Sequence, residues 1–213
     1  MPIPVRWEIA RPLPARDALA QVLGVDPVVA QVLIARGYDS ADRARAFLDA
    51  PLDSLPDPDG IVDVPAAAER LVRALRTHEP ITMYGDYDAD GVSATSILLR
   101  GLQALGGEVS FYIPSRFTEG YGLNDAALQR LAEGGRHLVV SVDCGVTAAA
   151  EIARAGERKQ DVIVVDHHEP GPALPPAVAV VDPKRRDGGA SFREYSAAGL
   201  AFQVLRAVRR RSQ

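Results

Sequence analysis

Cysteine and lysine are scarce in this sequence of 213 residues. Cys144 is the only cysteine, so no disulfide forms within the chain and a reducing compartment is expected. No apolar run approaches the roughly 20 residues of a bilayer-spanning helix. The first residues also lack the apolar core of a signal peptide. These absences predict a cytoplasmic protein without a membrane partner.

Charge and composition are ordinary for a globular protein. The net charge is −4, with 47% hydrophobic and 24% charged residues. An acidic balance argues weakly against a large nucleic-acid footprint. Divalent cations bound at an acidic site would cancel much of the local negative charge. Charge alone therefore does not exclude a nucleic-acid enzyme.

The chain changes character near residue 60. Residues 17–23 and 27–36 have helical apolar spacing, Ser40 is placed to cap a third helix, and residues 51–60 are rich in proline and glycine. We expect a small helical N-terminal segment, residues 1–60, packed on a core domain, residues 61–213.

Apolar strands alternate with amphipathic helices after Ile61. Strands are predicted over 81–84, 108–113, 137–142, 162–165 and 178–181, and helices over 65–76, 92–105, 124–132, 147–155 and 195–211. This order predicts an α/β fold: a doubly wound, mostly parallel sheet with helices on both faces. Four strands end in acid, and such ends meet at one edge of the sheet. These acids are Asp86, Asp143, Asp166 and Asp182.

The segment Asp86-Tyr87-Asp88-Ala89-Asp90-Gly91 concentrates three carboxylates in six residues. It matches the first half of an EF-hand calcium loop, but Ile97 stands where the loop needs Glu. The phosphatases of the haloacid dehalogenase type carry a similar motif, but that interpretation leaves the two later histidines unexplained. A solvated turn is disfavoured because three like charges repel unless a cation binds.

Two further acidic strand ends complete the candidate site. Asp143 fits a ligand that bridges two metal ions, or alternatively an N-cap for the helix expected from Thr147. Its neighbour Cys144 fits a small buried residue. Asp166-His167-His168 joins a carboxylate to two of the four histidines in the chain. Carboxylates and imidazoles together suit Mn²⁺, Mg²⁺ or Zn²⁺.

Arginines form two candidate substrate contacts. Arg116 lies on the loop expected at the same sheet edge, where it is placed to grip a phosphate or to remain an exposed loop residue. A C-terminal run of arginines fits a solvated helix face, with nucleic-acid contact as the alternative. This run comprises Arg206, Arg209, Arg210 and Arg211.

Taken in order, these motifs resemble the DHH phosphoesterase superfamily, and within it the branch of single-stranded-DNA exonucleases. The resemblance rests on the segments 84–92, 112–124, 142–145 and 166–168. It implies two ions, Mn²⁺ or Mg²⁺, and in-line hydrolysis of a phosphodiester. The implied metal ligands are Asp88, Asp90, Asp143 and His167. The implied catalytic residues are Asp86, Asp166 and His168, with Arg116 on the substrate phosphate.

The activity implied by this resemblance is that of a 5′→3′ exonuclease on single-stranded DNA in repair and recombination. The implied partners are DNA with a 5′ end, a single-strand-binding protein and a helicase, with the enzyme as a monomer. Relatives acting on very short oligonucleotides usually carry His where Tyr84 stands, which favours the DNA branch. Phosphoesterases of short oligonucleotides or cyclic dinucleotides, and a catalytically inactive scaffold, are the alternatives.

The family also places a metal-binding Asp and a second domain beyond the point that corresponds to Gln213. The resemblance therefore predicts that the chain is the front part of a longer protein. It also predicts weak or no activity for these 213 residues alone.

Overall fold

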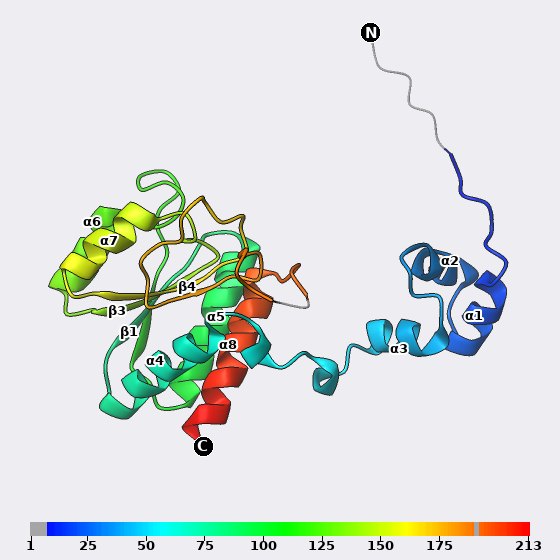
Figure 1. Ribbon diagram of the computed structural model, residues 1–213, viewed down its shortest axis with the longest axis horizontal. Coiled ribbons are helices and arrows are strands. Elements are labelled where there is room, and N and C mark those ends of the chain that lie inside the picture. Colours follow the sequence, from blue (N-terminus) through cyan, green and yellow to red (C-terminus); the bar gives the residue numbers. More distant parts are fainter. Residues whose placement is uncertain (1–7, 190–191) are drawn as a thin grey trace, which may run out of the picture. The chain divides into compact units, whose positions relative to one another are not determined.

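A computed structural model describes residues 8–189 and 192–213 of the chain (Figure 1). The chain divides into two compact units, residues 1–56 and 57–213. Each unit has its own apolar core.

The first unit is helical. It contains α1 (Arg16–Leu23), α2 (Pro27–Ala35), α3 (Ala41–Asp49) and the 3₁₀ turn η1 (Leu52–Ser54). Asp26 and Ser40 cap α2 and α3 by accepting hydrogen bonds from backbone N–H groups. Among the described residues, no single helix has the length and apolar character to cross a bilayer. Helices α1 and α2 meet the length and hydropathy criteria only when they are taken together, and the chain bends by 113° between them.

The second unit is built on a five-stranded sheet. Its strands are β1 (Ile81–Tyr84), β2 (Val109–Tyr112), β3 (Leu138–Val142), β4 (Asp161–Val165) and β5 (Ala179–Val181). They pair in the order β2-β1-β3-β4-β5, and every pairing is parallel. The strand order reverses beside β1 and β3, so the carboxyl ends of these two strands flank the crevice where such sheets bind ligands.

Helices cover both faces of this sheet (Figure 1). On one face lie α4 (Val64–Thr77), α5 (Ala89–Ala104) and α8 (Ala197–Ser212), and on the other lie α6 (Asp125–Glu133) and α7 (Ala149–Glu157). A 3₁₀ turn, η2 (Pro58–Gly60), precedes α4. Successive strand residues alternate between the two cores, as Val139 and Val140 do. The predicted doubly wound α/β fold is confirmed.

The turns that precede α5 and α7 determine the residue at which each helix begins. Helix α5 starts at Ala89, earlier than the predicted residue 92, because the Asp88 carboxylate caps it. Helix α7 starts at Ala149 instead of residue 147, because a turn containing Asp143 (φ 62°) and Gly145 (φ 113°) comes first. Asp143 therefore does not act as the N-cap of α7, which has no side-chain cap.

The amino end of the sheet is held by a charged cluster. The buried guanidinium of Arg70, on α4, donates to Glu79 at 2.7 Å and to Asp161 at 2.7 Å. Asp161 begins β4, and Glu79 precedes β1, so Arg70 links a helix to two strands. Near the end of α8, Arg210 pairs with Asp57, which precedes the 3₁₀ turn η2, and Arg211 pairs with Asp59, which lies within that turn.

Candidate metal centre

Asp86 follows β1 and is buried, with 4% of its surface exposed. Its Oδ1 atom has no hydrogen-bond partner among the described residues. Burial raises the pKa of Asp86, and the neighbouring Asp88 adds to the rise. A buried carboxylate oxygen without a donor is costly unless a proton or a cation satisfies it. Asp86 thus marks a position that favours a cation.

Asp88 is positioned by the first turn of α5. Its Oδ1 accepts hydrogen bonds from the N–H groups of Asp90 and Gly91, both at 2.9 Å. These N–H groups, the Gly91 one first, hold the pKa of Asp88 below its ordinary value. Gly91 is required here, because a Cβ atom on it would lie 2.6 Å from the Asp86 Cβ. The cap therefore leaves an ionised carboxylate at the start of the helix.

Asp143 lies at the end of β3 in the left-handed region, with φ 62°. Its N–H donates to the Val165 carbonyl at 3.0 Å, and its own carbonyl accepts from the Tyr121 hydroxyl at 3.1 Å. Burial, followed by the carboxylates of Asp90 and Asp88, raises the pKa of Asp143 to about 7. A bound cation would reverse that effect by favouring the carboxylate.

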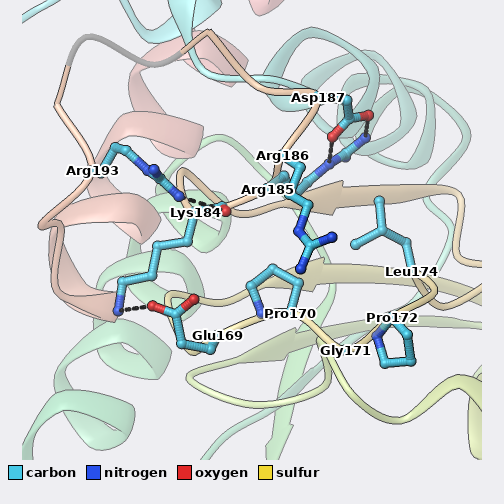
Figure 2. A pocket seen from close by; sticks show the side chains of 10 residues that line it. All are labelled: Glu169, Pro170, Gly171, Pro172, Leu174, Lys184, Arg185, Arg186, Asp187 and Arg193. Carbon is cyan, nitrogen blue, oxygen red and sulfur yellow. Dashed lines mark hydrogen bonds and ion pairs between the residues drawn. The ribbon is translucent and has the colours of Figure 1, made fainter.

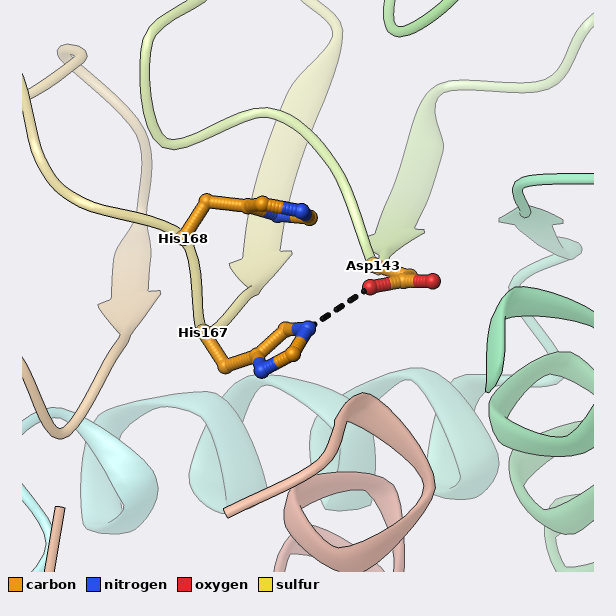
Figure 3. A group of neighbouring side chains, drawn as sticks. All are labelled: Asp143, His167 and His168. Carbon is orange, nitrogen blue, oxygen red and sulfur yellow. Dashed lines mark hydrogen bonds and ion pairs between the residues drawn. The ribbon is translucent and has the colours of Figure 1, made fainter. Parts of the chain in front are cut away.

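His167 faces two of these carboxylates (Figure 3). Its Nε2 atom lies 3.1 Å from Asp143 Oδ1 and 3.6 Å from Asp90 Oδ2. Asp90 is held in turn by α8, because its two oxygens accept from the N–H groups of Ala197 at 2.8 Å and Ala198 at 2.9 Å. The start of α8 therefore orients a predicted metal ligand that lies more than 100 residues earlier in the sequence.

Asp166 is buried at the end of β4 and organises His168. It accepts hydrogen bonds from the N–H groups of Val146, His167 and His168, and from the His168 Nδ1 atom at 2.7 Å. Burial alone would raise the pKa of Asp166, but these hydrogen bonds, with His168 first, outweigh it and lower the pKa. The same contact raises the pKa of His168. The contact therefore favours the protonated imidazole of His168 and holds its Nδ1 atom against Asp166.

The ligand atoms form two overlapping groups. Those of Asp143, His167 and His168 all lie within 4.8 Å of one another, and so do those of Asp86, Asp88 and Asp143. Asp143 is the member that the groups share. A set of carboxylate oxygens with an imidazole nitrogen fits Mn²⁺ or Mg²⁺. One of these oxygens, Asp86 Oδ1, accepts no hydrogen bond from any described residue, so it is free to bind a cation.

Two side chains frame the open side of this edge. The Arg116 guanidinium lies over the Tyr87 ring, 5.3 Å from its centre, so the predicted phosphate contact is adjacent to the acidic motif. Tyr121 was not predicted as a site residue. It donates to the Asp143 carbonyl, and its ring meets His168 edge-on at 6.1 Å. The only feature of the sequence that could have indicated a role for Tyr121 in the site is its position in the same loop as Arg116.

Known proteins are similar to this chain in both sequence and fold. The single-stranded-DNA-specific exonuclease RecJ of Bacillus subtilis is 43% identical over 205 residues, which are 96% of this chain and 26% of that protein. RecJ of Thermus thermophilus is 38% identical over 216 residues, 97% of this chain and 30% of that protein. The chain thus spans less than a third of the length of these relatives.

Solved structures agree with the sequence comparison. The crystal structure of RecJ from Thermus thermophilus in complex with Mn²⁺ has a TM-score of 0.73 and 35% identity. It covers 95% of this chain and 28% of that one. The crystal structure of exonuclease RecJ bound to manganese has a TM-score of 0.68 and 40% identity, covering 76% of this chain and 40% of that one.

The family assignment rests on the domain that carries the acidic edge. The model of the DHH family, N-terminal domain, matches residues 80–213, which contain β1 to β5 and every carboxylate and histidine of the two ligand groups. The chain therefore belongs to the DHH family.

Proposed function

We propose that this chain carries the metal-dependent phosphodiesterase site of a single-stranded-DNA-specific exonuclease that acts in the 5′→3′ direction. The similarity to RecJ proteins supports the substrate class. The observation that carries the proposal is the shared position of Asp143 in two ligand groups, because a bridging carboxylate is what a two-metal phosphodiesterase needs.

We divide the acidic and imidazole side chains of the site into metal ligands and a residue that orients them. Asp88, Asp90, Asp143 and His167 would hold the cations, preferably Mn²⁺ or Mg²⁺. The buried Asp86 would either bind a cation as a further ligand or orient one of these four ligands. When bound, two divalent cations lower the pKa of water and neutralise charge on the reacting phosphate.

His168 belongs to one of the two ligand groups, but Asp166 engages its Nδ1 atom, so we assign proton transfer to His168. Asp166 accepts from its Nδ1 atom at 2.7 Å and raises its pKa, which favours the protonated form of the imidazole. A positioned imidazolium of this kind donates a proton to a leaving oxygen. Arg116, held over Tyr87 beside the acidic motif, would bind the substrate phosphate.

The partners and the compartment follow from the substrate. A 5′-ended single strand is produced by strand separation and covered by single-strand-binding protein. A helicase and such a binding protein are therefore the partners that we propose, with the cytoplasm as the compartment.

The experiment compares a 5′-labelled single-stranded oligonucleotide with its blunt duplex, using the full gene product with Mn²⁺ and after chelation. Hydrolysis of the single strand alone, lost on chelation, is expected. Asp88→Asn should abolish it. The control Glu157→Gln alters an exposed acid at the end of α7, outside both ligand groups, and should keep it. Equal hydrolysis of the duplex, or turnover that survives chelation, would contradict the proposal.

A further inference from the structure

A basic hollow of about 420 Å³ adjoins the metal centre (Figure 2). It lies between the loop after β4 and the loop after β5, with Arg193 at its side. Glu169, at one wall, directly follows His168. The hollow therefore belongs to the same carboxyl edge of the sheet as the acidic site, but none of its lining residues belongs to either ligand group.

The floor of the hollow is held rigidly by Arg185. This buried guanidinium donates to Asp63 at 2.6 Å and to the Val180 carbonyl at 2.6 Å, and it forms a two-pronged pair with Asp187. The Asp182 carboxylate accepts from the Lys184 N–H at 2.7 Å. The Arg185 guanidinium therefore holds the loop in place through hydrogen bonds within the protein. The side chains of its neighbours Lys184 and Arg186 line the hollow.

Three cationic groups on this loop and beside it remain available to a ligand. Arg186 is exposed, has no hydrogen bond or ion pair within the described part of the chain, and points into the hollow toward Pro170 (Figure 2). Arg193 donates to the Lys184 carbonyl at 2.8 Å, which orients its guanidinium. Lys184 lies 3.6 Å from Glu169, a carboxylate that is 82% exposed, and such a surface pair is weak.

The lining has an excess of positive charge, with four basic side chains against two acidic ones. This excess stands out in a chain whose net charge is −4. Like charges gathered in one hollow repel one another, and an anion relieves that repulsion. Guanidinium groups favour phosphate in particular, because their planar fork matches its oxygens.

The opposite wall is apolar and stiff. Pro170, Pro172 and Leu174 line it beside the cations. Proline rings lose little entropy when they are covered, so they offer a preformed surface to a sugar or a base. A ligand that combines a phosphate with an apolar body is a nucleotide unit. The volume also lies in the range of roughly 300–1,000 Å³ that is typical of small-molecule sites.

We propose that the basic hollow binds a backbone phosphate of the polynucleotide substrate, outside the scissile phosphodiester, with Arg186, Arg193 and Lys184 as its contacts. The inference rests on the proposed function, because it assigns a second contact to the same substrate.

The test uses the double variant Arg186→Gln with Arg193→Gln in the full gene product. Both side chains are exposed, so the fold should be retained. The control is Arg100→Gln on α5, an exposed arginine far along the helix from the acidic motif. Each protein is assayed on a long single-stranded oligonucleotide and on a nucleotide p-nitrophenyl ester, which has one phosphodiester and no further backbone phosphate for the hollow to bind.

The double variant should raise KM for the oligonucleotide and lower the salt slope of binding by ~0.7 per lost contact. Turnover of the ester should be unchanged, and the control should resemble the wild type on both substrates. Unchanged KM and salt slope for the oligonucleotide would overturn the proposal. So would a loss confined to binding of a free mononucleotide, since the hollow would then be a product site. A wild type that cleaves neither substrate would instead refute the proposed function.

Discussion

The imidazole Nε2 of His167 lies 3.1 Å from the Oδ1 atom of Asp143, although 24 residues separate them. The two side chains come from the ends of adjacent parallel strands, β4 and β3. Parallel pairing brings strand ends with the same direction to the same edge, so each strand needs only one polar residue after its last apolar one. The acidic site is a consequence of this register.

Replacing Asp143 should remove metal binding without unfolding the protein. Asp143→Asn keeps the shape of the side chain but deletes the charge that both ligand groups share. Loss of such a ligand should weaken Mn²⁺ binding by tenfold or more, judged from the tenfold to hundredfold losses seen for supporting residues. Isothermal titration calorimetry measures the affinity, and circular dichroism checks the fold. A folded variant with wild-type Mn²⁺ affinity would remove Asp143 from the site.

The metal-free protein should be more stable in mild acid than in mild base. Burial and the nearby carboxylates raise the pKa of Asp143 to about 7, so the folded state holds a proton that the unfolded chain has released. The stabilisation is complete below the ordinary pKa of aspartate and is lost as the pH rises through about 7. Thermal melts in chelator across this range measure it. Asp143→Asn should flatten the profile, and an equally steep profile in that variant would assign the effect elsewhere.

Mn²⁺ affinity should change in the opposite direction with pH. The cation competes with the proton on Asp143, so binding should strengthen as the pH rises through about 7 and should release a proton below it. Titrations in two buffers of different ionisation enthalpy count that proton. Binding that is independent of pH would show that Asp143 is already ionised in the metal-free protein.

His168 should affect turnover and not metal affinity. His168→Gln removes the proton donor that Asp166 orients, and loss of a general acid typically costs about 10²–10⁴-fold in rate. His167→Gln is the matched variant, because it alters the neighbouring imidazole that faces Asp143. It should weaken Mn²⁺ binding as well. If both variants lost Mn²⁺ equally, His168 would be a ligand and not the acid.

Two helical glycines provide a paired test of close packing. Gly91→Ala places a Cβ atom 2.6 Å from the Asp86 Cβ and 2.8 Å from its carbonyl oxygen, so it should destabilise the fold and weaken Mn²⁺ binding. Gly156→Ala, on α7, meets nothing within 4 Å and should stabilise by about 0.5–1 kcal/mol. Denaturant unfolding measures both. Equal effects would mean that the turn at Asp86 adjusts freely.

Arg70 should matter for stability alone. Its buried guanidinium joins Glu79 and Asp161 at the amino end of the sheet, and Arg70→Met should cost about 2–4 kcal/mol by leaving charged partners without their donor. Arg73→Met is the control, because that side chain is 64% exposed and 3.7 Å from Asp161, so its loss should cost about 1 kcal/mol or less. Reduced Mn²⁺ affinity in folded Arg70→Met would show that the two ends of the sheet are coupled.

The sequence predicted the parts of the site that local pattern determines. Apolar runs located the strands, and the first acid within two residues of each run's end located Asp86, Asp143 and Asp166. Contacts between distant segments carried no such pattern. The bond from Asp90 to the start of α8 spans 107 residues, and the Tyr121 contact with the Asp143 carbonyl depends on how a loop folds back. The basic hollow was also unpredicted, because its arginines come from a segment without periodicity.

The bond between Asp90 and α8 also gives the molecule a built-in reporter. The amide protons of Ala197 and Ala198 are donated directly to the Asp90 carboxylate, so their chemical shifts and exchange rates register its charge. Because these amides belong to a helix and not to the site, nuclear magnetic resonance reads them without any substitution at a ligand. Titrating a diamagnetic ion such as Mg²⁺ while following two backbone signals would then count occupancy at Asp90 and, in the same spectrum, show how firmly the first turn of α8 is held.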